Sequence, residues 1–306
     1  MSHFRQNPHP SSLIKRPAED LLAAGTTMGA VELLVRDLDA MITFYHEGML
    51  LEVLQQVGDA AILGTNSQPS VLLRQVENLP PFNPRGAGLF HTAILYDSPA
   101  DLSAAVLNVA QRYPHSFTGV GDHIFSEAFY FNDPEGNGVE LYRDRPRENW
   151  ERDEHGLYAL ATLGFDPNAY LQDNLNPLRT TTADSTLGHV HLQVGDVGTA
   201  RDFYAGVLGF EVTGEIDTAV FVSAGGYHHH LGLNVFQSQG AGPRAASYGL
   251  GRVDIDVPTE DDRAALAARL KDHGVTSRDD GRTLEFNDPW NSLIRVKAAT
   301  SEKASL

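Results

Sequence analysis

Two stretches of this chain occur twice, and this duplication limits the possible folds more than any other feature of the sequence. FYHEGMLLEV (44–53) matches FYAGVLGFEV (203–212), and NDPEGNGVEL (132–141) matches NDPWNSLIRV (287–296). Together with the apolar runs and helix starts around them, they mark four copies of one unit, each a strand, a helix and then three strands. Since one such unit cannot bury its apolar face alone, we expect the copies to pack against one another.

Each unit opens with an apolar run followed by a helix-capping residue. The runs are 31–35, 91–95, 189–194 and 253–257, and the caps are Asp37, Ser98, Asp196 and Thr259. The predicted fold class is α+β, with four βαβββ modules forming two domains. The expected division is an N-terminal arm (1–26), a first domain (27–145), a linker (146–186), a second domain (187–298) and a C-terminal tail (299–306). We expect His3 and His9 of the arm to be solvent-exposed rather than functional.

The composition restricts the possible partners. The 306 residues include no cysteine, so any metal must be held by His, Asp, Glu or Tyr, which favours iron or manganese without excluding zinc. A formal charge of −17 argues against nucleic-acid binding, which depends on clustered Lys and Arg. No stretch approaches the roughly 20 apolar residues of a membrane span, and the N-terminus lacks the apolar core of a secretory signal, so the expected location is cytoplasmic.

The repeats act as a ruler for locating equivalent positions. The residue seven before each helix cap is Ala30, His91, His189 or Arg252, and the residue seven after the Asp of each Asn-Asp-Pro turn is Glu140 or Arg295. The second and third units thus carry two histidines and a carboxylate, a set that can hold one face of a divalent ion and leave positions open for substrate and oxygen. The alternatives are that each histidine is an ordinary core residue and that Glu140 is a surface carboxylate.

A single stretch, 121–140, combines a histidine, a tyrosine, a sharp turn and this carboxylate. It reads GDHIFSEAFYFNDPEGNGVE and contains His123, Tyr130 and Glu140. Phe129–Phe131 and 139–142 read as two strands joined by the Asp-Pro-Glu-Gly-Asn turn.

The repeat and this stretch resemble the vicinal oxygen chelate superfamily, which includes glyoxalase I, fosfomycin and bleomycin resistance proteins and extradiol dioxygenases. Gly121-Asp122-His123, Phe129-Tyr130, Asp133-Pro134-Glu135-Gly136 and Glu140 match the signature of the extradiol enzymes. The resemblance covers about residues 27–297 and is greatest to the two-domain bacterial catechol 2,3-dioxygenases.

This resemblance implies a site and a reaction. The implied metal ligands are His91, His189 and Glu140 for Fe(II), with Mn(II) as the alternative, and the implied reaction inserts O2 into catechol or a substituted catechol. Tyr130 and His123 are implied as catalytic residues. His230, from the run His228-His229-His230 that we expect in a buried strand, is the implied acid–base residue, although which of the three faces the metal is left open. A homo-oligomer is also expected.

Two other functions remain possible at this point. One is a different metal-dependent enzyme of the superfamily, such as a glyoxalase-like isomerase or a transferase. The other is a non-catalytic protein that binds a small molecule.

The fourth unit departs from the family pattern. Many extradiol enzymes take all three iron ligands from their last two units, where this chain has Arg252 and Arg295. We therefore predict that units two and three pair around the metal, while units one and four form a module without a metal. Had units one and two paired instead, His91 and Glu140 would be separated from His189.

Overall fold

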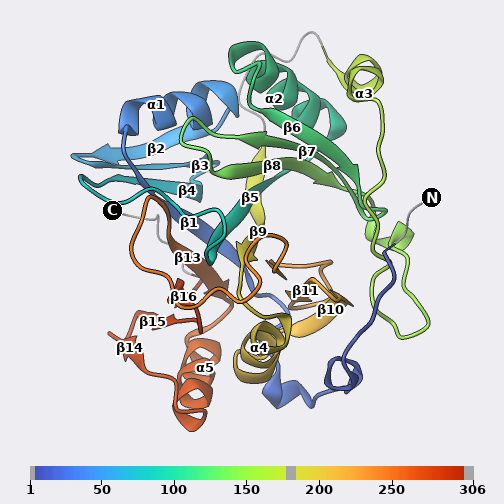
Figure 1. The fold of residues 1–306 in the computed structure, drawn as a ribbon, viewed down its shortest axis with the longest axis vertical. Helices are drawn as coiled ribbons and strands as arrows, with labels where there is room; N and C mark the ends of the chain where they lie inside the picture. Colours follow the sequence, from blue (N-terminus) through green and yellow to red (C-terminus); the bar gives the residue numbers. More distant parts are fainter. Residues whose placement is uncertain (1–3, 177–183, 300–306) are drawn as a thin grey trace.

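The computed structural model describes residues 4–176 and 184–299, whose strands form two eight-stranded sheets (Figure 1). The strands of the first sheet are β1 (Thr27–Val35), β2 (Glu52–Val57), β3 (Ala60–Thr65), β4 (Gln68–Gln75), β13 (Gly249–Val257), β14 (Ser277–Asp279), β15 (Thr283–Asn287) and β16 (Leu293–Ala298). Those of the second sheet are β5 (Gly88–Tyr96), β6 (Phe117–Asp122), β7 (Ser126–Asn132), β8 (Gly138–Asp144), β9 (Ser185–Gln193), β10 (Glu211–Ile216), β11 (Ala219–Ser223) and β12 (Leu231–Asn234).

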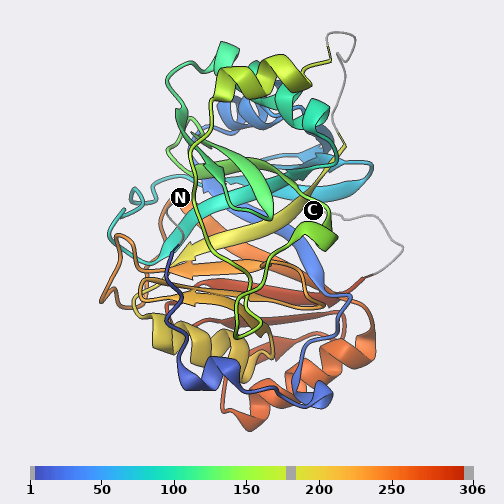
Figure 2. The same cartoon turned by 90° about the vertical axis from the view of Figure 1, so that its right-hand side faces the viewer.

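Four of the five α-helices in the described residues begin where the capping residues predict, and the third lies within the segment that was expected to be a linker. The five helices are α1 (Leu38–Thr43), α2 (Pro99–Arg112), α3 (Pro167–Asn174), α4 (Val197–Arg201) and α5 (Glu260–Asp272), and π turns at Phe44–Gly48 and Asp202–Val207 extend α1 and α4. The side chains of Asp37, Ser98, Asp196 and Thr259 each accept a hydrogen bond from the first turn of the following helix. Figure 2 shows the helices gathered at the two ends of the long axis, with the strands between them.

Strand order confirms the predicted pairing of the units. The first sheet runs β14-β15-β16-β13-β1-β4-β3-β2, so units one and four meet where β1 lies antiparallel to β13. The second runs β10-β11-β12-β9-β5-β8-β7-β6, and units two and three meet where β5 lies antiparallel to β9. The α+β fold of four βαβββ modules is confirmed. Each sheet takes strands from both halves of the sequence.

Equivalent tyrosines tie neighbouring units together at the repeated turns. Tyr45 donates a hydrogen bond to Asp133 over 3.1 Å, and Tyr204 donates one to Asp288 over 3.0 Å. All four residues are buried. The two duplicated stretches are therefore partners in space, because each FY segment binds the Asp of the Asn-Asp-Pro turn in the following unit.

Residues 158–163, which precede the third unit, and residues 4–7 of the N-terminal arm lie beside the second sheet. Tyr158 N donates to Thr213 O over 2.8 Å, and Asp122 N donates to Leu163 O over 2.9 Å. In the arm, Phe4 N donates to Leu160 O over 2.9 Å and Asn7 N to Glu215 O over 3.2 Å. Of the two arm histidines expected to be exposed, His9 is exposed and His3 lies outside the described residues, while residues 4 and 7 of the arm are hydrogen-bonded to the rest of the fold. No helix in the described ranges is long and apolar enough to cross a membrane.

Candidate metal centre

The register of three neighbouring strands brings the predicted ligands onto one face. Ala93 of β5 is paired with Glu140 of the parallel strand β8 on one side and with His189 of the antiparallel strand β9 on the other. His91 lies two residues before Ala93 and so points to the same face of the sheet. The positions found by comparing the repeats therefore lie close together in the structure.

One ligand atom from each of His91, Glu140 and His189 lies within 4.8 Å of the other two, and all three residues are at most 5% exposed. Glu140 Oε2 is 2.9 Å from His91 Nε2 and 3.2 Å from His189 Nε2. The His91 contact lacks the geometry of a hydrogen bond, so this buried nitrogen has no hydrogen-bond partner among the described residues. A buried polar atom without a partner is costly, and a metal ion would satisfy it.

The electrostatics of the cluster also suit a cation. Burial lowers the pKa of His189 to about 4, so its ring is neutral at pH 7 and keeps a lone pair for a metal. Burial alone would raise the pKa of Glu140, but the two facing imidazoles outweigh it and hold that pKa well below its usual range. A neutral imidazole at His189 beside an ionised Glu140 is the combination of protonation states that divalent metals bind, so this cluster fits such an ion.

Tyr130 and His123 lie beside this cluster as a hydrogen-bonded pair. His123 Nδ1 is 2.8 Å from Ala161 O, and His123 Nε2 is 2.7 Å from the Tyr130 hydroxyl. Because a carbonyl only accepts, Nδ1 carries the proton, and Nε2 of a neutral ring then accepts from the tyrosine. A Cβ on Gly121 would lie 2.7 Å from His123 Nε2, which explains the glycine at the start of the signature.

Burial raises the pKa of Tyr130 well above its usual value, and Glu140, its register partner across β7 and β8, raises it further. The phenol therefore stays protonated at neutral pH, so it donates its one proton to His123 Nε2 while its oxygen can still accept a hydrogen bond.

The three consecutive histidines correct one expectation. They are buried, but they form a loop between β11 and β12 instead of a strand, because Gly225 and Gly226 turn the chain with φ of 62° and 70° just before them. His229 faces the cluster, with its ring centroid 4.2 Å from that of His189. Burial lowers the pKa of His229 well below its usual value.

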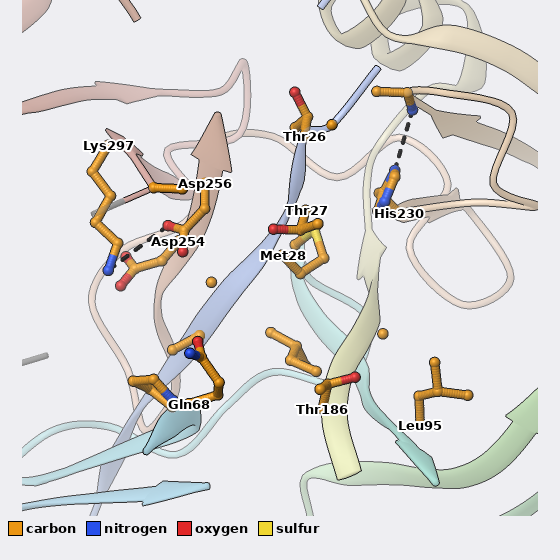
Figure 3. A pocket seen from close by; sticks show the side chains of 18 of the residues that line it. Thr26, Thr27, Met28, Gln68, Leu95, Thr186, His230, Asp254, Asp256 and Lys297 are labelled. Carbon is orange, nitrogen blue, oxygen red and sulfur yellow. Dashed lines mark hydrogen bonds and ion pairs between the residues drawn. The ribbon is translucent and has the colours of Figure 1, made fainter. Parts of the chain in front are cut away.

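His230, predicted as the acid–base residue, lies elsewhere. Its Nδ1 accepts a hydrogen bond from Ala224 N over 3.2 Å, and its ring lines a separate pocket of about 810 Å³ together with Thr26 and Asp254 (Figure 3). The prediction rested on matching the following segment LGLNV (231–235) to the resembled family, and that match does not account for the turn. The residue that reaches the cluster is the preceding one, His229.

A chain of hydrogen bonds fixes the orientation of the His229 ring. His229 Nδ1 is 2.9 Å from His228 Nδ1, and His228 Nε2 is 2.9 Å from a carboxylate oxygen of Asp144. Since the carboxylate accepts, His228 Nε2 carries a proton, and in the tautomer with no proton on Nδ1 that atom accepts from His229 Nδ1. His229 Nε2 is then left with a lone pair.

The cavity over the cluster measures about 590 Å³ and also contains residues that the sequence did not single out. His191 lies opposite His91 in the β5–β9 register, and the two ring centroids are 4.9 Å apart. The buried Nε2 of His191 has no hydrogen-bond partner among the described residues. The spacing His189-Val190-His191 could have revealed it, since alternate residues of a strand share a face. Phe4 of the N-terminal arm lines the same cavity, and nothing in its sequence context indicated this.

The equivalent face of the first sheet holds ion pairs instead. Glu32 lies 2.8 Å from Arg74 and 2.9 Å from Arg252, and Asp254 pairs with both Arg252 and Arg295. The arginines at the ligand positions of the fourth unit are thus bound to carboxylates. Among the described residues, the His91–Glu140–His189 cluster is the one group of this kind suited to a metal.

The model of the Glyoxalase/Bleomycin resistance protein/Dioxygenase superfamily matches residues 27–141 and 186–295. The chain belongs to this superfamily. It is 34% identical over 271 residues to a catechol-2,3-dioxygenase of Bacillus subtilis, covering 86% of this chain and 94% of that one.

Solved structures match the fold. Glyoxalase I from Zea mays aligns with a TM-score of 0.57 at 18% identity, over 90% of this chain and 92% of that one. The CppA protein from Streptococcus pneumoniae aligns with a TM-score of 0.56 at 11% identity, over 89% of this chain and 98% of that one.

Proposed function

We propose that this protein is an Fe(II)-dependent extradiol ring-cleaving dioxygenase that inserts O2 into catechol or a substituted catechol. The observation that carries the proposal is the buried convergence of His91, Glu140 and His189 beside Tyr130 and His229. The similarity to a protein named catechol-2,3-dioxygenase supports it. A cytoplasmic location and a homo-oligomer remain part of the proposal.

His91, His189 and Glu140 would hold the metal. When bound, ferrous iron would supply the site at which the diol and dioxygen meet and exchange electrons. Two nitrogens and one oxygen on one side leave the other side open to the cavity. The donor set also suits manganese, so metal analysis has to choose between them.

The remaining residues handle protons and orientation. His229 Nε2, with its free lone pair, is the group that would take a proton from the diol and return it later in the reaction. The Tyr130 hydroxyl would orient a substrate oxygen by hydrogen bonding, with His123 fixing the position of the phenol. His228 and Asp144 would hold His229 in the tautomer that this role needs.

The test is turnover by protein loaded with ferrous iron without air. On addition of catechol and air, we expect one O2 to be consumed per catechol and a yellow ring-opened semialdehyde to form. Glu140→Ala should lose iron and activity together, whereas Tyr130→Phe should keep the iron and slow turnover. Full iron content and activity in Glu140→Ala would refute the ligand assignment.

The same preparations distinguish the other functions considered from sequence. Glutathione-dependent loss of methylglyoxal would indicate a glyoxalase-like isomerase. Tight binding of a small molecule without any metal would indicate a non-catalytic binding protein.

A further inference from the structure

The outer part of the 590 Å³ cavity is built by segments that lie outside the metal-bearing strands. Leu160 comes from the segment between the second and third units, and Phe4 comes from the N-terminal arm. Phe4 and Phe236 are 46% and 49% exposed, yet both line the cavity. Exposed aromatic rings around a cavity often mark a surface that a ligand covers.

The arm is held firmly enough to make Phe4 a fixed wall. Gln6 bonds in two directions, with its amide nitrogen 2.7 Å from Tyr158 O and its amide oxygen 2.9 Å from Glu215 N. Glu215 lies on β10, the edge strand of the second sheet, and is itself buried and 2.9 Å from Arg201. The backbone of Asn7 also bonds to Glu215, whereas the backbone of Phe4 bonds to Leu160 O, so residues 4–7 are held between the β10 edge and the segment that precedes the third unit.

The cavity is larger than catechol requires. A cavity of about 150 Å³ is enough to hold a benzene molecule, so 590 Å³ leaves room for a substituent about the size of a second ring. The proposed ligands are at most 5% exposed and lie at the deep end. A diol bound there would direct its substituent outward, toward the rim that includes Phe4.

The lining of the cavity selects an uncharged substituent. Among the described residues that line it there is no Lys or Arg, and the one acid is Glu140. The largest group among the rest is apolar and includes Phe90, Phe125, Phe131, Phe221 and Ile216, and the others are histidines, glycines and uncharged polar residues. A carboxylate on the ring would find no cationic partner here, and burying an unpaired charge is costly.

We propose that the substrate is a catechol bearing an uncharged, apolar substituent about the size of a ring, and that Phe4 of the N-terminal arm is the wall on which this substituent packs. The proposal rests on the dioxygenase function proposed above. It makes the arm a specificity-determining element of a site whose metal lies in the second and third units.

The test measures ligand binding and ring cleavage separately. Full-length protein loaded with ferrous iron is titrated calorimetrically without oxygen with 3-phenylcatechol, catechol and 3,4-dihydroxybenzoate. We expect 3-phenylcatechol to bind at least about tenfold more tightly than catechol, and the benzoate at least about tenfold more weakly. Phe4→Ala should weaken binding of 3-phenylcatechol about three- to tenfold and that of catechol less than about twofold.

Leu13→Ala is the matched control. Leu13 lies in the same arm, and its exposed fraction of 40% is similar to the 46% of Phe4. It does not line the cavity. Neither diol should bind differently to this variant. Equal effects of Phe4→Ala on both diols, or binding of the benzoate as tight as that of 3-phenylcatechol, would overturn the proposal.

Adding oxygen to the same complexes distinguishes the two proposals. Selective binding that depends on Phe4 without any ring cleavage would refute the dioxygenase function and support the Phe4 wall. Ring cleavage without selectivity would refute the wall and support the dioxygenase. Failure of all three diols to bind would refute both.

Discussion

Replacing His229 and His230 separately tests the most specific feature of the site. The two residues are adjacent and both are 7% exposed, but His229 faces His189 whereas His230 accepts a hydrogen bond from Ala224 N. If only His229 exchanges protons with the substrate, then only His229→Ala should lose catalytic rate. His230→Ala should lose structural stability instead.

The loss of catalytic rate in His229→Ala and the loss of stability in His230→Ala can be estimated separately. A positioned acid–base group contributes about 10²- to 10⁴-fold to rate. We expect His229→Ala to lower kcat about 100- to 1000-fold, equivalent to about 2.7–4 kcal/mol in the barrier. His230→Ala leaves the buried amide of Ala224 without its acceptor, which costs about 1–3 kcal/mol of unfolding free energy, while kcat should change less than about threefold.

The assay is kcat for catechol at saturating oxygen, with iron content and thermal unfolding measured on the same preparations. Equal iron in both variants is needed for the comparison, since His229 lies against a proposed ligand. If His230→Ala lost as much turnover as His229→Ala at equal iron content, the assignment from geometry would be wrong.

Three further predictions use contacts at and away from the cluster. Asp144→Asn removes the charge that faces His228 at 2.9 Å and should lower kcat about tenfold or more with iron content unchanged, and an unchanged kcat would show that the His228–Asp144 chain does not orient His229. Glu32→Gln removes a buried carboxylate that pairs with Arg252, itself largely buried, and with the part-exposed Arg74, and it should lower the unfolding free energy in denaturant titrations by about 3 kcal/mol with no loss of metal. Glu47→Gln, at the exposed pair with Arg112, should cost less than about 1 kcal/mol. Burial raises the pKa of Asp133 from 3.8 to about 6, so the stability that its protonated form provides is lost as pH rises through 6. The unfolding free energy of Asp133→Asn relative to the natural chain should therefore increase by about 2 kcal/mol from pH 4.5 to 7.5, and a constant difference would contradict the raised pKa.

The sequence contained enough information to find the three proposed ligands because repeats convert spacing into register. His91 and His189 stand at the same distance before a helix cap, and the caps are observed where they were expected. Equivalent strand positions then meet when two units pair across their opening strands. Arg252 and Arg295 in the fourth unit already excluded a second metal site, and the ion pairs with Glu32 and Asp254 explain what these arginines do.

What the sequence could not provide depends on contacts between distant segments and on local turns. The choice between His229 and His230 follows from positive φ angles at Gly225 and Gly226, which end the strand alternation. Phe4 reaches the cavity because Gln6 binds an edge strand about 210 residues later in the chain, and no local pattern reports such a contact. His191 was recoverable, since it shares the strand face of His189.

The way each sheet combines strands from both halves has a consequence for the integrity of the protein. Neither half alone contains all three proposed ligands, because His91 and Glu140 precede the 146–186 segment and His189 follows it. A chain cut within that segment would give two inactive fragments, each with unpaired edges at β1 and β5 or at β9 and β13. Reassociation of the two fragments would rebuild both sheets and the proposed metal cluster together. If each fragment were fused to a different protein, recovery of the proposed activity would report that the two fused proteins bind each other.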